Sequence, residues 1–170
     1  MNASTPSQGL PGQPHIAYAH DQLMVEGVRL SDLAREHGTP LFVYSKAAML
    51  SALAAYQRGF AGRKAQICYA MKANSTLAVL QVFAEAGCGF DTVSGGELAR
   101  VLAAGADPAK VIFSGVGKTR AEMKQALQVG IGCFNVESEA ELDVLSEVAL
   151  SLGQKAPVSL RVNPNVDPKT

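Results

Sequence analysis

A lysine stands at the end of an apolar stretch in YAMKANS, residues 69–75, among neighbours that are otherwise small, apolar or uncharged. Side chains alternate along a strand, so Lys72 is predicted to share one side of its strand with Ala70 and Cys68. An ammonium group in such a narrow interior loses water, and desolvation favours the neutral amine, which is the form that attacks carbonyl carbons. Lys72 therefore has the position expected of a lysine that forms a Schiff base.

Two further charged residues, Asp91 and Arg161, are predicted to project from neighbouring strand ends. They could fix charge around an aldehyde cofactor bound to Lys72. The same three residues could equally form a buried salt-bridge network without a catalytic role. Their spacing is compatible with both interpretations.

The elements that must position these residues follow a regular pattern. Five strand-like segments begin at residues 67, 89, 111, 133 and 158, so their starts lie 22, 22, 22 and 25 residues apart. Helical patterns lie between them, and three of these begin with a capping box: Ser94 with Glu97, Thr119 with Glu122, and Ser138 with Glu141. Strands that alternate with helices at this spacing predict parallel βα units.

The strand faces distinguish a barrel from a doubly wound sheet. In CFNVE, Phe134 and Val136 alternate with Cys133, Asn135 and Glu137, so one face is apolar and the other polar. A doubly wound sheet carries helices on both faces and needs apolar residues on both, whereas a barrel has helices outside only. The predicted fold class is therefore α/β, a (β/α) barrel of the TIM type with its polar residues at the carboxyl ends of the strands.

A P-loop is not indicated by SGVGKT at residues 114–119, because the motif requires glycine where Ile112 stands. Thr119 is explained as a helix cap, and Glu97 by its capping box. Three scattered cysteines and three histidines without ligand spacing predict neither a disulfide framework nor a metal site.

Composition limits the partners. The 170 residues are 48% apolar, and 15 basic residues balance 15 acidic ones, so no nucleic-acid or anionic-membrane surface is expected. The N-terminus lacks the features of a signal peptide, which predicts a cytoplasmic protein. Residues 1–15 are rich in Pro, Gly, Ser and Gln and are predicted to be a disordered tail, followed by short extended pieces and a brief helix over 16–44.

Five motifs in order, YAMKANS, GFDTVSGGEL, FSGVGKT, FNVES and LRVNPNVDPKT, resemble the diaminopimelate decarboxylase family. This family belongs to the alanine-racemase-like (fold-type III) pyridoxal-phosphate enzymes. The resemblance begins near residue 20 and implies the N-terminal portion of such an enzyme. Residues 45–170 would supply about the first five units of a (β/α)8 barrel, and residues 16–44 would belong to a β domain.

The resemblance also implies a site and a reaction. Lys72 would carry pyridoxal 5'-phosphate as a Schiff base, Ala70, Asp91 and Arg161 would line the cofactor, and Glu97 would lie near the site. The implied reaction is decarboxylation of meso-2,6-diaminopimelate to L-lysine and CO2, the last step of lysine biosynthesis, in a homodimeric full-length enzyme. Two alternatives stay open: a related decarboxylase of ornithine, arginine or carboxynorspermidine, and a non-catalytic pyridoxal-phosphate-binding relative.

Overall fold

The computed structural model describes residues 8–10, 13–162, 164 and 166–167. The chain divides between residues 61 and 62 into two compact units, which are described separately. None of the helices in the described residues is long and apolar enough to cross a membrane.

The first unit contains a four-stranded antiparallel sheet and two helices. The strands are β1 (Gln8–Leu10), β2 (Gln13–Ala19), β3 (Gln22–Val25) and β4 (Val28–Arg29), paired in that order, and the helices are α1 (Leu30–His37) and α2 (Lys46–Gly59). Two-residue turns with positive φ at His20–Asp21 and Glu26–Gly27 join β2 to β3 and β3 to β4. This geometry matches the right-handed twist of a hairpin, and Gly27 adopts it without a side-chain clash.

Two predicted boundaries are wrong in this unit. Gln8–Leu10 and the start of β2 lie inside the segment 1–15 that we predicted as a disordered tail; residues 1–7 and 11–12 lie outside the described residues. The polar composition misled the prediction because β1 forms by pairing with β2. The unit also extends past residue 44 to include α2, since the Glu26 carboxylate accepts hydrogen bonds from the Ser45 hydroxyl and the Ala47 N–H at the start of that helix.

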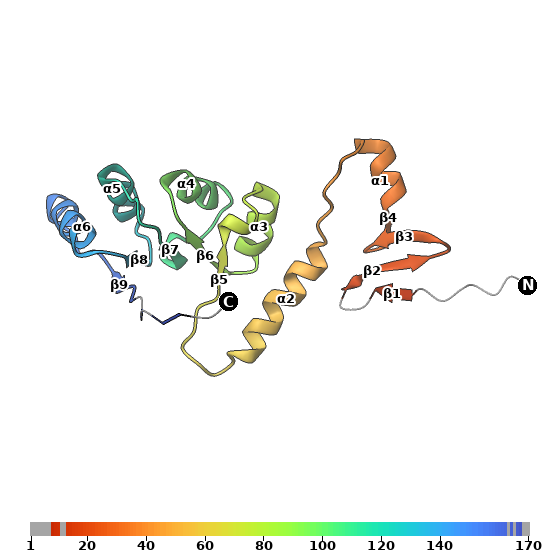
Figure 1. Ribbon diagram of the computed structural model, residues 1–170, viewed down its shortest axis with the longest axis horizontal. Helices are drawn as coiled ribbons and strands as arrows, with labels where there is room; N and C mark the ends of the chain where they lie inside the picture. The colour runs from red at the N-terminus through yellow and green to blue at the C-terminus, as the bar shows by residue number, and fades with distance from the viewer. Residues whose placement is uncertain (1–7, 11–12, 163, 165, 168–170) are drawn as a thin grey trace, which may run out of the picture. The chain divides into compact units, whose positions relative to one another are not determined.

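The second unit is a five-stranded parallel sheet with its helices along one face (Figure 1). The strands pair in chain order: β5 (Cys68–Ala70), β6 (Gly89–Thr92), β7 (Val111–Phe113), β8 (Cys133–Val136) and β9 (Val158–Leu160). The connecting helices are α3 (Leu77–Glu85), α4 (Gly95–Ala103), α5 (Arg120–Val129) and α6 (Glu139–Ser151), with short 3-10 turns η1 (Met71–Ala73) and η2 (Pro108–Lys110). Sequential strand order with helices on one face is the winding of a (β/α) barrel, so the predicted fold class is confirmed.

The core of this unit lies between the sheet and its helices. Phe90, Phe113 and Phe134 are fully buried, and the rings of Phe113 and Phe134 stack with centroids 6.1 Å apart. The intervening residues Asp91 and Asn135 are only partly buried. The predicted division into an apolar and a polar face is therefore correct for β8.

Strand β9 forms one edge of the sheet and pairs only with β8 among the described strands. Its apolar side chains are open to solvent: Val158 is 44% exposed and Leu160 is 65% exposed. No helix follows β9 in the described residues, so nothing there covers this strand as α5 and α6 cover β7 and β8.

Candidate functional site

Lys72 lies just beyond the carboxyl end of β5, in the 3-10 turn η1, and its side chain is exposed. We predicted it as the last residue of the strand, with its amine in a narrow interior, and the structure corrects both points. Strand β5 ends at Ala70, and the completely buried Met71 anchors the turn that follows. The turn breaks the alternation of side chains, and the five strands form an open sheet that does not enclose the amine.

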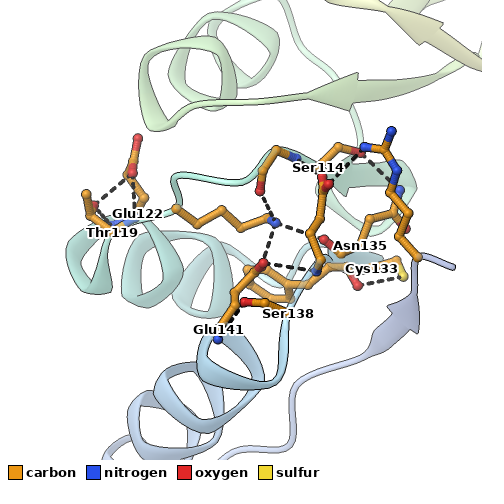
Figure 2. Close-up of polar contacts among 12 residues, drawn as sticks. Ser114, Thr119, Glu122, Cys133, Asn135, Ser138 and Glu141 are labelled. Carbon is orange, nitrogen blue, oxygen red and sulfur yellow. Dashed lines mark hydrogen bonds and ion pairs between the residues drawn. The ribbon is translucent and has the colours of Figure 1, made fainter. Parts of the chain in front are cut away.

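Asp91 lies on β6 directly beside β5, where Ala70 is its partner in the parallel register. Its Oδ1 atom accepts a hydrogen bond of 2.6 Å from the Ser114 hydroxyl, which follows β7. Ser114 in turn accepts a hydrogen bond of 3.0 Å from the side-chain amide of Asn135 on β8 (Figure 2). We call these three residues, Asp91, Ser114 and Asn135, the polar row. It runs across three adjacent strand ends on the face away from the buried phenylalanines.

Arg161 follows β9 at the other side of the sheet and is 58% exposed. Its guanidinium forms an ion pair of 2.9 Å with Oε2 of Glu137, and the other oxygen of Glu137 accepts the backbone N–H of Gly115 at 2.8 Å. The Gly115 hydrogen bond, followed by the charge and hydrogen bond of Arg161, holds the pKa of Glu137 below its ordinary 4.5, against the opposing effect of desolvation.

The structure therefore brings Lys72, Ala70 and Asp91 to the neighbouring carboxyl ends of β5 and β6, whereas β7 and β8 lie between Asp91 and Arg161. The prediction that Asp91 and Arg161 project from neighbouring strand ends is wrong, because pairing in chain order places them three strands apart. Within the described residues no ion pair joins Lys72, Asp91 and Arg161, so the alternative of a salt-bridge network among them is not formed. Each of the two later residues instead has a local partner, Ser114 or Glu137.

Glu97 lies in the first turn of α4, close to the carboxyl end of β6. Its backbone N–H donates to the Ser94 hydroxyl at 3.2 Å, while its carboxylate accepts the N–H of Val93 at 2.7 Å. In the predicted capping box the Glu97 carboxylate would accept the N–H of Ser94, but it accepts the N–H of the preceding residue, Val93. This hydrogen bond explains Glu97 as a cap, and its contact with the cofactor stays a prediction.

Sequence reasoning missed Lys118, whose side chain is completely buried. Its ammonium donates three hydrogen bonds: to Glu141 Oε1 at 2.6 Å, to the carbonyl of Gly115 at 2.7 Å and to the carbonyl of Asn135 at 2.8 Å. It also lies over the ring of Phe113, 5.8 Å from the centroid. No pattern around GKT distinguishes this lysine from a surface residue, whereas Ser114 could have been found by continuing the alternation from Ile112.

Glu122 is the most completely bonded carboxylate of the predicted caps. It forms the full capping box with Thr119 (Figure 2). Its Oε1 also accepts the N–H of Gly95 at 2.7 Å. The Gly95 hydrogen bond, followed by those from Thr119, lowers the pKa of Glu122 below 4.5. A lowered pKa stabilises the folded state above the ordinary value, and that contribution is lost as the pH falls through the lowered pKa.

We expect Glu122→Gln to reduce the free energy of unfolding at pH 7 by about 0.5 kcal/mol, since a neutral amide interacts less with the helix N-terminus. The difference should shrink as the pH falls from 4.5 through the lowered pKa of Glu122, because the parent carboxylate becomes protonated over that range. Urea unfolding between pH 7 and pH 3 measures this, with exposed Asp143→Asn on α6 as control. A difference that persists unchanged at pH 3 would contradict the assignment.

Comparison with known proteins decides the family. Residues 46–170 match the family model described as pyridoxal-dependent decarboxylase, pyridoxal binding domain. The chain belongs to the pyridoxal-dependent decarboxylases. The cofactor that the sequence predicted, pyridoxal phosphate, is thus the one that this decarboxylase domain is described as binding.

Several relatives of this chain are named diaminopimelate decarboxylase. Diaminopimelate decarboxylase of Pseudomonas aeruginosa is 58% identical over 155 residues, which are 91% of this chain and 37% of that protein. The crystal structure of diaminopimelate decarboxylase from M. jannaschii superposes with a TM-score of 0.89 at 34% identity and covers 94% of this chain and 38% of its own. That of the Helicobacter pylori protein complexed with L-lysine has a TM-score of 0.79 at 46% identity and covers 82% and 36%. The chain thus spans less than two fifths of these relatives.

The residues of this decarboxylase domain suit an aldehyde cofactor. An exposed primary amine at Lys72 can bond to an aldehyde carbon, and the methyl side chain of Ala70 leaves space beside it. Asp91, on the strand next to β5, presents a carboxylate whose position is fixed by the Ser114 hydroxyl. The amine of Lys72, the small side chain of Ala70 and the oriented carboxylate of Asp91 therefore lie at adjacent strand ends.

Proposed function

We propose that the polypeptide containing this chain decarboxylates meso-2,6-diaminopimelate to L-lysine and CO2 with pyridoxal 5'-phosphate as cofactor. The observation that carries the proposal is the 58% identity to diaminopimelate decarboxylase of P. aeruginosa across 91% of this chain. The Helicobacter pylori relative that was crystallised with L-lysine, the product of this reaction, supports the same substrate class.

We assign the roles of four residues within this proposal. Lys72 attaches the cofactor through its amine, and Ala70, Asp91 and Arg161 line it. When bound, pyridoxal phosphate withdraws electrons from the carbon that loses the carboxylate. That carbon loses CO2 and gains one proton, which balances the reaction.

The chain's own groups act by position and charge. The exposed amine of Lys72 can reach a small aldehyde without displacing a packed side chain. Asp91 is oriented by the Ser114 hydroxyl, so its charge does not have to reorganise when a ligand binds. Arg161, paired with Glu137 but 58% exposed, still has guanidinium hydrogens for an anionic group. Glu97 supports the end of β6, the strand that carries Asp91, by accepting the N–H of Val93.

The proposal extends to the assembly and location of the full-length protein. We place it in the cytoplasm as a homodimer that binds neither nucleic acid nor membranes, in accord with the balanced charge of the 170 residues. A decarboxylase of ornithine, arginine or carboxynorspermidine, or a cofactor-binding protein without activity, is the alternative that the assay must separate.

The test is the release of CO2 from candidate amino acids by the full-length protein supplied with pyridoxal phosphate. We expect CO2 and an equal amount of L-lysine from meso-diaminopimelate, at a kcat/KM at least about 100-fold above that for ornithine or arginine, because a site that bonds a substrate's polar groups rejects analogues lacking them. Activity on ornithine, arginine or carboxynorspermidine but not on meso-diaminopimelate would transfer the protein to a related decarboxylase. Cofactor binding without CO2 from any of these amino acids would indicate the non-catalytic alternative.

A further inference from the structure

We propose that Lys118 is a positioning residue for the cofactor site: its buried ammonium holds the ends of β7 and β8 so that Asn135 and Ser114 orient the carboxylate of Asp91. The inference rests on the cofactor assigned to this domain and deepens the proposed function. It does not depend on which amino acid the full-length enzyme decarboxylates.

The first observation is the burial of a charge that the proposed reaction does not use. The side chain of Lys118 is 0% exposed, and that of its partner Glu141 is 9% exposed. Removing two charges from water is unfavourable, and their attraction offsets this cost only with good geometry and further hydrogen bonds. Lys118 has these bonds, because all three hydrogens of its ammonium have acceptors.

The second observation is which atoms accept the other two hydrogens of the Lys118 ammonium. One binds the carbonyl of Gly115, the residue after Ser114, and the other binds the carbonyl of Asn135 itself. Lys118 thus links the backbone at the ends of β7 and β8, next to the two side chains that meet at 3.0 Å in the polar row. Figure 2 shows Ser114 and Asn135 side by side at these strand ends, with Glu141 approaching from α6.

The third observation is that the hydrogen bonds of Lys118 and Glu141 extend through Glu137 to Arg161. Glu141 accepts the Lys118 ammonium with one oxygen and the N–H of Glu137 at 3.0 Å with the other. Glu137 in turn holds Arg161 and the N–H of Gly115. Hydrogen bonds and ion pairs therefore connect Asp91 with Arg161, two proposed cofactor residues that lie three strands apart.

The test measures cofactor affinity and the visible absorption of bound pyridoxal phosphate in the full-length protein, not activity alone. In Lys118→Met/Glu141→Gln both charges are removed together, and the glutamine oxygen can still accept the Glu137 N–H. We expect this variant to fold and to bind pyridoxal phosphate about tenfold more weakly, with a shifted absorption maximum, as for a lost charge-assisted hydrogen bond.

Two comparisons separate positioning from general stability. Ser114→Ala should weaken cofactor binding to a similar extent, and Ser114→Thr, which keeps the hydroxyl, should restore it. Leu98→Ala, in the buried face of α4, should destabilise the fold but leave affinity and absorption within twofold of the parent. Parent-like affinity and absorption in Lys118→Met/Glu141→Gln would overturn the proposal, as would equal losses in Leu98→Ala. Because this test uses no amino-acid substrate, its outcome does not depend on the diaminopimelate assay, and failure of one can be distinguished from failure of the other.

Discussion

Substitution of Lys72 by alanine is expected to reduce decarboxylation by the full-length protein by roughly 10⁴-fold or more, the scale seen when an enzyme loses a group that forms a covalent bond in its reaction. The loss should be in kcat, because the amine is the only group of the proposed site that can bond covalently to an aldehyde. The fold should tolerate the change, since Lys72 is exposed and surface substitutions usually alter stability by less than about 0.5 kcal/mol.

Borohydride reduction of the parent with bound cofactor provides the direct measurement. It converts the bond between the aldehyde carbon and the lysine nitrogen into a stable amine, so the label should be recovered on the peptide that contains Lys72. Lys72→Arg, which keeps the positive charge, should remain unlabelled and inactive, and Lys124→Ala on the exposed side of α5 should behave as the parent. Label on another lysine would refute the assignment of Lys72.

Removing one partner of the buried ion pair should give the second large effect. We expect Glu141→Gln to lower the free energy of unfolding by about 3–5 kcal/mol, because it leaves the ammonium of Lys118 without a counter-charge in a fully buried position. Lys118→Met should cost a similar amount by leaving the carboxylate of Glu141, only 9% exposed, in the same state.

The double variant supplies the control for this prediction. Lys118→Met/Glu141→Gln has no buried charge left, so we expect it to be at least about 1–3 kcal/mol more stable than either single variant. Urea unfolding of the four proteins gives the coupling free energy. Additive losses would mean that the two side chains do not interact in solution. As a matched pair, exposed Arg120 and Glu147 should couple by less than about 1 kcal/mol.

Much of the fold could be predicted because local signals and tertiary structure agree. Phe134 and Val136 alternate with Asn135 in the sequence, and the structure buries the first two under helices and leaves the third on the polar face. Strand β1 could not be predicted in the same way. Its residues Gln8–Leu10 have the composition of a tail, and they form a strand only because β2 offers a partner.

The site was predicted less completely, because its geometry depends on distant residues. Lys72 follows the alternation of its strand in the sequence, but the turn that starts at buried Met71 moves it out of that pattern. The burial of Lys118 depends on Glu141, which lies 23 residues away, and on two backbone carbonyls. Backbone acceptors carry no residue type, so no motif could have revealed this cluster.

The open edge at β9 also affects how these experiments must be done. An edge strand with unpaired backbone groups and exposed Val158 and Leu160 can pair with the same edge of a second molecule. We therefore expect the 170-residue chain, when produced alone, to self-associate and to give broad, concentration-dependent elution in size-exclusion chromatography. A longer polypeptide that covers this edge is the suitable material for both cofactor titration and unfolding.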